Sequence, residues 1–149
     1  MGLPKNILVS GAITAISTAV ATAAVAQAEN DDAASAFNAA SHVVWGAEAT
    51  DQDGGSARYT GTGLVVHAAA MLGWAALQEI VLGRWVRRGP PARAAVSGAA
   101  TSAAAYAIDY HVLPERLTPG IEKRLSPAAM AIAYGVLAAA LAVGVRKGR

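Results

Sequence analysis

The sequence predicts an all-α integral membrane protein, a four-helix bundle with a short surface helix in its first outer loop. Of its 149 residues, 54% are hydrophobic and only 15% are charged, and the apolar residues fall in four long runs. About 20 helical residues cross a hydrocarbon core roughly 30 Å thick. We therefore expect one transmembrane domain over residues 1–149, with spans at about 7–27, 61–83, 94–113 and 127–145.

The first run extends from Ile7 to Ala26 without a charge. Small residues recur in it at every fourth position, a spacing that lets another helix approach closely. They are Gly11, Ala15, Ala19 and Ala23. The alternative is a cleaved signal peptide, because Ala26-Gln27-Ala28 resembles a cleavage site. The run is longer than the apolar part of such peptides, and one lysine precedes it, so an uncleaved anchor is favoured.

The connection over residues 28–60 is long and polar. Its stretch from Ala34 to Ala49 is apolar but is interrupted by Asn38 and Ser41, which argues against a fifth crossing. We expect a helix lying on the membrane surface here, with Trp45 in the headgroup region. The segment after it, residues 50–56, has the composition of a flexible polar linker.

The second run has several large or polar side chains on one helical face, and a basic cluster follows it along the chain. His67, Met71, Trp74 and Gln78 share a helical face, with Glu79 beside it. Pairing with Arg84 or Arg87, together with snorkelling toward the interface, explains Glu79 without a functional role. The methionine and tryptophan of this face are typical of core packing.

The last two apolar runs differ in how clearly they predict a membrane span. The third has fifteen residues between Arg93 and Asp109, so its helix must continue through His111 toward Leu113. Its alanine, glycine and serine content indicates shielding by protein. The fourth begins after Ser126, a good helix N-cap. Its small stripe is Ala131, Gly135 and Ala139.

Basic residues gather on one side of the four-span topology. Eight of the twelve lie there, with no acid in the same loops: Lys5, Arg84, Arg87, Arg88, Arg93, Arg146, Lys147 and Arg149. The positive-inside rule then puts both termini in the cytoplasm. Because these clusters flank spans, lipid is their expected partner, and we expect no nucleic-acid binding.

Histidines and one carboxylate lie toward the predicted outer face. His42, His67, Asp109 and His111 could bind a divalent metal or pass a proton, because ionisable groups near spans often have such roles. Hydrogen bonds to adjacent helices are the alternative. Gln78 and Glu79 are the other polar residues of interest within a span.

The sequence offers no catalytic or cofactor-binding residues that we can assign. It contains no G-x-S-x-G, no H-E-x-x-H and no phosphate-binding glycine loop. It also contains no cysteine, which excludes disulfides and thiolate metal sites. These observations favour a protein that is not an enzyme.

The chain resembles a family of small, uncharacterised bacterial inner-membrane proteins with four spans. The matching positions lie within residues 37–126, and the run between the last two spans is the most specific. They are Asn38, Ser41-His42, Trp45-Gly46, Tyr59-Thr60-x-x-Gly63, His67, Trp74, Glu79, Asp109-Tyr110, Pro114-Glu115-Arg116-Leu117-Thr118-Pro119-Gly120 and Glu122. Family members often have a second histidine where this chain has Ala68, which weakens a metal site inferred from the resemblance. The resemblance implies the location and architecture but no reaction.

From these observations we expect a non-enzymatic accessory or interaction protein of the bacterial inner membrane. Its partners would be the lipid bilayer and either another protein or further copies of itself. The alternative is an oligomeric channel, or a proton- or metal-coupled carrier that uses the histidines and carboxylates near the outer face. The first measurement that separates these hypotheses is metal binding by the wild type beside His67→Ala and Asp109→Asn.

Overall fold

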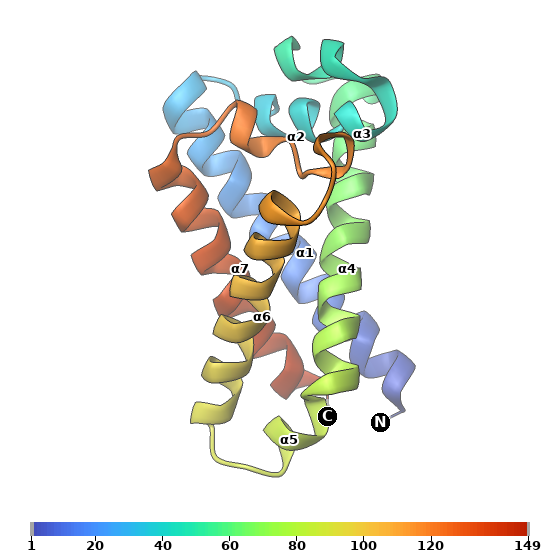
Figure 1. The fold of residues 1–149 in the computed structure, drawn as a ribbon, viewed down its shortest axis with the longest axis vertical. Helices are drawn as coiled ribbons and strands as arrows, with labels where there is room; N and C mark the ends of the chain where they lie inside the picture. The colour runs from blue at the N-terminus through green and yellow to red at the C-terminus, as the bar shows by residue number, and fades with distance from the viewer. Residues whose placement is uncertain (1, 149) are drawn as a thin grey trace. The chain divides into compact units, whose positions relative to one another are not determined.

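The computed structural model describes residues 2–148, and all regular structure in this range is helical. Four long helices are present: α1 (Leu3–Asn30), α4 (Thr62–Val81), α6 (Ala92–His111) and α7 (Pro127–Lys147) (Figure 1). The short ones are α2 (Ser35–Ala40), α3 (His42–Trp45), η1 (Ala47–Asp51), η2 (Ala57–Gly61), α5 (Gly83–Arg87), η3 (Glu115–Leu117) and η4 (Ile121–Lys123). The all-α prediction is confirmed.

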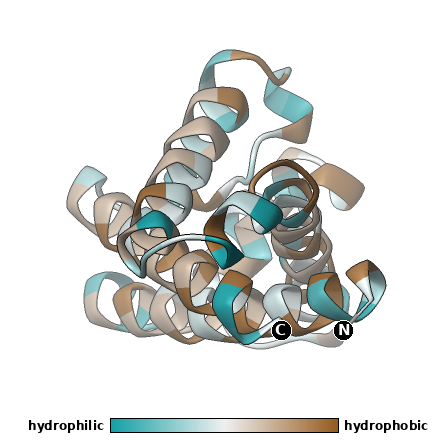
Figure 2. Cartoon of the chain, turned by 90° about the horizontal axis from the view of Figure 1, so that it is seen from below, coloured by the Kyte–Doolittle hydropathy of each residue, from teal (hydrophilic) through white to brown (hydrophobic). Residues whose placement is uncertain are grey.

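Three of the long helices are long and apolar enough to cross a membrane. These are Leu3–Asn30, Ala57–Val81 and Pro127–Lys147. Hydrophobic and near-neutral residues dominate the long helices in Figure 2, and hydrophilic residues gather in short segments. The third predicted span is a helix, α6, but its alanine, glycine, serine and threonine residues make it less apolar than the others.

The chain forms two compact units. Unit 1 comprises the residues up to Thr18, Ala68–Tyr106 and the residues from Tyr134 onward; unit 2 comprises Ala19–His67 and Ala107–Ala133. Unit 1 therefore holds α5 and parts of the four long helices, and unit 2 holds the short helices of the two long connections.

Local signals explain where the long helices begin and end. Pro4 lies in the first turn of α1, where its missing N–H is tolerated, and Asp31 follows the last residue with a left-handed φ of 53°. Ser126 caps α7, as predicted, because its Oγ accepts a hydrogen bond from the Ala129 N–H at 3.1 Å. Ser56 does the same at the Tyr59 N–H, 3.0 Å away, before the π-helical turn that leads into α4.

The core of unit 1 is small and rich in alanine. Ala75, Ala105, Leu137 and Leu141 form one buried cluster, and Met71, Trp74 and Tyr134 pack against it. Val86, Ala94 and Val145 form a second. The prediction that Met71 and Trp74 serve core packing is confirmed.

Glycine permits close helix contacts at two places in unit 1. A Cβ built on Gly11 would overlap the Leu72 side chain of α4, and one built on Gly98 would lie 3.0 Å from the Ala142 backbone nitrogen of α7. Ser102 of α6 adds a hydrogen bond to the Tyr134 carbonyl at 2.7 Å. These contacts fix one face of α6 against α7.

The predicted small-residue stripes do not mark the buried faces. On α7, Ala131, Gly135 and Ala139 are exposed, and nothing lies within 4 Å of a Cβ built on Gly135. On α1 only Gly11 of the predicted stripe is fully buried. The buried face of α1 carries polar residues at every fourth position instead: Asn6, Ser10, Thr14, Thr18 and Thr22.

The hydroxyl groups of Thr14 and Thr18 can lie inside this helix because carbonyl groups of the helix itself accept their hydrogen bonds. Thr14 Oγ1 donates to the Ser10 carbonyl at 2.8 Å, and Thr18 Oγ1 donates to the Thr14 carbonyl at 2.7 Å. A side chain of this kind is as small as valine and exposes no unpaired donor, so it serves the close packing that was expected of alanine and glycine.

Two further predictions about connections were wrong. The segment from Ala34 to Ala49 is not a surface helix: it divides into α2, α3 and η1, and all six residues of α2 are buried in unit 2. The reason is that α2 contacts η1, η2 and η4, so protein rather than lipid covers its apolar residues. The predicted spans 61–83 and 94–113 leave the basic segment between them as a connecting loop, but residues 83–87 of this segment form the helix α5.

Candidate functional site

The short helices of unit 2 are joined into one ordered structure, which we call the cap: residues 31–61 and 112–126. Its parts contact one another, since α2 lies against η1, η2 and η4 and α3 lies against η3. The cap therefore combines the two connections that the sequence places far apart.

His42 joins the two connections in the interior of the cap. Its Nε2 lies 2.8 Å from the Thr118 carbonyl oxygen in a buried hydrogen bond. The chain reaches this position through Gly120, whose φ of +79° is left-handed. A Cβ on Gly120 would lie 2.6 Å from both the Ala39 carbonyl oxygen and the His42 ring, so only glycine fits.

Two arginine side chains of the second connection form hydrogen bonds with the backbone of the first connection. Arg116 donates to the Val43 and Val44 carbonyls at 3.1 and 3.2 Å. Arg124 donates to the Thr50 carbonyl at 3.3 Å and forms an ion pair with Asp53. Carbonyl groups that a short helix leaves free are thereby satisfied.

Asn38 holds the segment that was expected to be a flexible linker. Its Nδ2 donates to the Gln52 and Gly54 carbonyls at 3.0 and 2.9 Å, and its Oδ1 accepts from Thr60 at 2.6 Å. Asp32 accepts from the Gly54 N–H at 2.8 Å. The prediction of a flexible linker was wrong, because buried polar groups of α2 need these partners.

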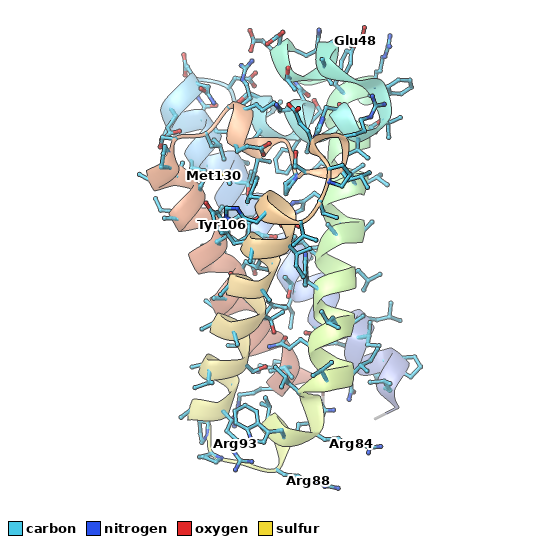
Figure 3. The ribbon with its side chains drawn as sticks, viewed as in Figure 1. Glu48, Arg84, Arg88, Arg93, Tyr106 and Met130 are labelled. Carbon is cyan, nitrogen blue, oxygen red and sulfur yellow. The ribbon has the colours of Figure 1, made fainter. Side chains whose placement is uncertain are left out.

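One exposed surface of the cap gathers aromatic and charged side chains, which we call the aromatic–arginine cluster: Trp45, Glu48, Arg58 and Tyr59. The Arg58 guanidinium lies 4.6 Å from the Trp45 ring and 5.0 Å from the Tyr59 ring. Glu48 Oε1 accepts from Arg58 at 2.9 Å and from the Tyr59 hydroxyl at 3.1 Å. Glu48 lies at the outer edge of the cap in Figure 3. These contacts hold three exposed side chains and the half-buried Tyr59 in one arrangement.

A second exposed ion pair belongs to the run Pro114–Gly120 and the turn after it. Lys123 Nζ lies 2.9 Å from Glu115 Oε1. The hydrogen bond from Lys123, with its charge, lowers the pKa of Glu115. The same hydrogen bond raises the pKa of Lys123. Since Glu115 is 83% exposed, the pair contributes little to stability.

The residues predicted to bind metal are placed as follows. His42 engages Thr118, and the His67 ring lies edge-on to Phe37 with centroids 5.7 Å apart. Asp109 and His111 lie in the last turn of α6, and each interacts with other groups of the protein. In residues 2–148 no three or more His, Asp or Glu side chains are grouped as a metal site requires. Metal binding by these residues stays a prediction.

Glu79 and Gln78 lie inside unit 1 and are bonded to different helices. The Glu79 side chain has no exposed surface, and its Oε2 pairs with Arg87 at 2.6 Å. Gln78 donates to Ser97 of α6 at 2.7 Å. Of the two partners expected for Glu79, Arg87 is the one used. Glu79 does not snorkel, because its carboxylate is buried and pairs with Arg87 of α5.

Basic residues surround α5. Arg84, Arg88 and Arg93 lie around α5 and the turn that follows it in Figure 3. Arg93 lies 4.9 Å from the Trp85 ring and donates to the Trp85 carbonyl at 3.0 Å. Arg84 and Arg88 are exposed, whereas Arg87 is committed to Glu79.

Sequence reasoning missed Asn6 and Ser10 of α1. Both are buried in unit 1, at 4% and 0% exposure. The available signal was the recurrence of a polar residue at every fourth position from Asn6 to Thr22, which competes with the alanine and glycine pattern one residue away.

Comparison of the chain with models of protein families, with curated proteins and with solved structures found no match.

Proposed function

We propose that this chain is a multi-pass protein of the bacterial inner membrane that docks a partner protein on its cap and has no enzymatic activity of its own. The observation that carries the proposal is the joining of two separate connections by buried bonds, such as His42 to Thr118, into one ordered surface. Ordering this many residues costs conformational entropy, and connections that only link spans can be short.

The aromatic–arginine cluster supports docking. Tryptophan, tyrosine and arginine are the residues enriched at the energetic centres of protein interfaces. Here Trp45 (39% exposed) and Arg58 are exposed and Tyr59 is half-buried, and the three are already held together by Glu48 and by cation–π contacts. Side chains fixed before binding lose less entropy on binding, which favours affinity.

We further propose four spans, α6 included, with both termini in the cytoplasm. The support is the distribution of charge. In unit 1 the basic residues are Lys5, Arg84, Arg87, Arg88, Arg93, Arg146 and Lys147, and Glu79 is the one acid among its described residues. The cap instead contains acids such as Asp51 and Glu122. Such an asymmetry follows the positive-inside rule.

Site-specific photo-crosslinking in native membranes tests the docking function. A photoreactive phenylalanine analogue at position 59 replaces the half-buried Tyr59. We expect one discrete protein adduct, reduced about tenfold or more by Arg58→Ala because loss of an interface centre weakens binding by such factors. The same reagent at Lys123, outside the cluster, is the control and should give no such adduct. Adducts with lipid alone would contradict the proposal, whereas an adduct with a second copy would identify the partner as the protein itself.

The alternative function is an oligomeric channel or a proton- or metal-coupled carrier. The buried polar face of α1 favours it, because polar residues inside spanning helices often line pathways. The two functions differ in their response to His67→Ala and Asp109→Asn. A carrier should lose ion flux in vesicles in both variants, whereas a docking protein should keep the position-59 adduct unchanged.

A further inference from the structure

We infer that oxygen atoms of Asn6, Ser10 and Glu79 form a binding site for a monovalent cation in unit 1, independent of the docking function. Four buried side-chain atoms of residues 2–148 have no hydrogen-bond partner in the protein, and all four are oxygens: Asn6 Oδ1, Ser10 Oγ, Gln78 Oε1 and Glu79 Oε1. Buried polar atoms without a partner are rare, because each costs about 1–3 kcal/mol, so each needs an explanation.

Two of these atoms, Ser10 Oγ and Glu79 Oε1, lie against the end of α7, and so do the backbone and Cβ of Asn6. A Cβ built on Gly148 would lie 3.1 Å from Asn6 Cβ and 3.2 Å from Glu79 Oε1. One built on Gly144, a helical turn earlier, would lie 2.5 Å from Ser10 Oγ. The two glycines thus bring α7 against the polar face of α1 and the carboxylate of α4. Gln78 is separate, since its amide is directed to Ser97 of α6.

The chemistry of these atoms specifies the ligand. A carboxylate and an amide oxygen only accept hydrogen bonds, and a hydroxyl oxygen has lone pairs to offer, so the site suits an electropositive partner and not an anion. Oxygen ligands without nitrogen or sulfur are those that hard cations prefer. Sodium sites in membrane transporters combine such oxygens with the C-terminal ends of helices, as the end of α7 does here.

Charge balance favours one positive charge over two. The Glu79 carboxylate is already paired with Arg87 through Oε2 at 2.6 Å. A bound cation would therefore be attracted mainly by the partial negative charge at the C-terminal end of α7, about half an elementary charge, and by the dipoles of the oxygen ligands. Within unit 1 the other charged groups on these elements are all basic: Lys5, Arg84, Arg146 and Lys147. A divalent ion would need additional anionic ligands to offset this surplus.

Sodium titration of the full-length protein in detergent tests the inference. The midpoint of thermal unfolding is followed by tryptophan fluorescence, with choline chloride holding the ionic strength constant. We expect NaCl to raise the midpoint in a saturable way, because a ligand that binds only the folded state stabilises it. Asn6→Leu, which removes an oxygen, should weaken the apparent sodium affinity by about tenfold or more.

Two further variants keep the test decisive should Asn6→Leu fail to fold. Asn6→Asp adds a carboxylate and should tighten sodium binding, by roughly tenfold, because opposite charges in contact attract. Gly148→Ala places a methyl group between Asn6 and Glu79 and should remove the sodium dependence, whereas Gly135→Ala, with nothing within 4 Å, should retain it. Equal effects of sodium and choline on the wild type, or no gain in Asn6→Asp, would overturn the inference and indicate bound water only.

Discussion

At the scale of single residues, the role of a buried polar side chain in this protein depends on the group to which it is hydrogen-bonded. Glu79 and His42 are both buried, and each is bonded to one group: Glu79 to Arg87 and His42 to the Thr118 carbonyl. Neither bonding partner could be predicted from the spacing of residues along the sequence. For Glu79 the sequence limited the choice to two arginines, and for His42 it offered no partner.

The ion pair of Glu115 and Lys123 makes the stability of the folded protein depend on pH. The lowered pKa of Glu115 means that folding favours its ionised form. The resulting stabilisation is complete above the ordinary value of 4.5 and is lost as pH falls through the lowered value in the folded protein. For Lys123 the stabilisation is complete below 10.5 and is lost as pH rises through the raised value.

Replacement of Lys123 checks the cause of this shift. Lys123→Met removes the hydrogen bond and the charge, so the pKa of Glu115 should return toward 4.5. Lys123→Arg, the control, preserves both and should leave the pKa of Glu115 low. NMR titration of the Glu115 carboxyl group measures it. An unchanged pKa in Lys123→Met would show that another group is responsible.

At the scale of elements, backbone contact decides which faces of the helices meet. On α4, a Cβ built on Gly63 would overlap the Phe37 carbonyl oxygen and lie 2.6 Å from its carbon, whereas nothing lies within 4 Å of one built on Gly73. The first glycine lets α2 reach α4 within unit 2. The second has no such role.

Alanine at these two positions should have opposite effects. Gly63→Ala should destabilise the protein by about 1–3 kcal/mol, because an overpacked contact forces the backbone to shift. Gly73→Ala should be neutral or stabilise it by up to about 1 kcal/mol through helix propensity. Thermal unfolding in detergent compares the two. Equal midpoints would mean that α2 does not pack on α4 as described.

The helical elements were largely predictable because each signal is local. Apolar length, Pro4 and the Ser126 cap mark their bounds within a few residues. The helix faces that pack against one another were not predictable from local signals. On α7 the predicted stripe through Gly135 is exposed, since small size permits close contact but does not specify it. The second span was predicted to end at residue 83, close to Val81 where α4 ends, but the short helix α5 that follows was missed.

At the scale of the whole molecule, topology is the property to measure first. The chain contains no cysteine, so single-cysteine variants report one position each. We expect Asp51→Cys, in the exposed part of the cap, to react with a membrane-impermeant maleimide in intact cells. Arg88→Cys, exposed near α5, should react only after lysis.

The outcome tests both the orientation and the number of spans. The unsubstituted protein, which lacks cysteine, is the control for background labelling. Labelling of Arg88→Cys alone in intact cells would reverse the proposed orientation. Labelling of both variants in intact cells would contradict the proposal that α4 crosses the membrane between these two positions.

The sequence by itself determined the helical class, three apolar helices of spanning length and the separation of basic from acidic segments. These depend on residue type and on neighbours in the chain, which composition and periodicity record. Only the tertiary structure decided that α2 is buried, that the two connections form one cap and that Asn6 lies near Glu79. Each of these depends on a contact between residues far apart in the chain, and spacing along the chain carries no information about distance across it.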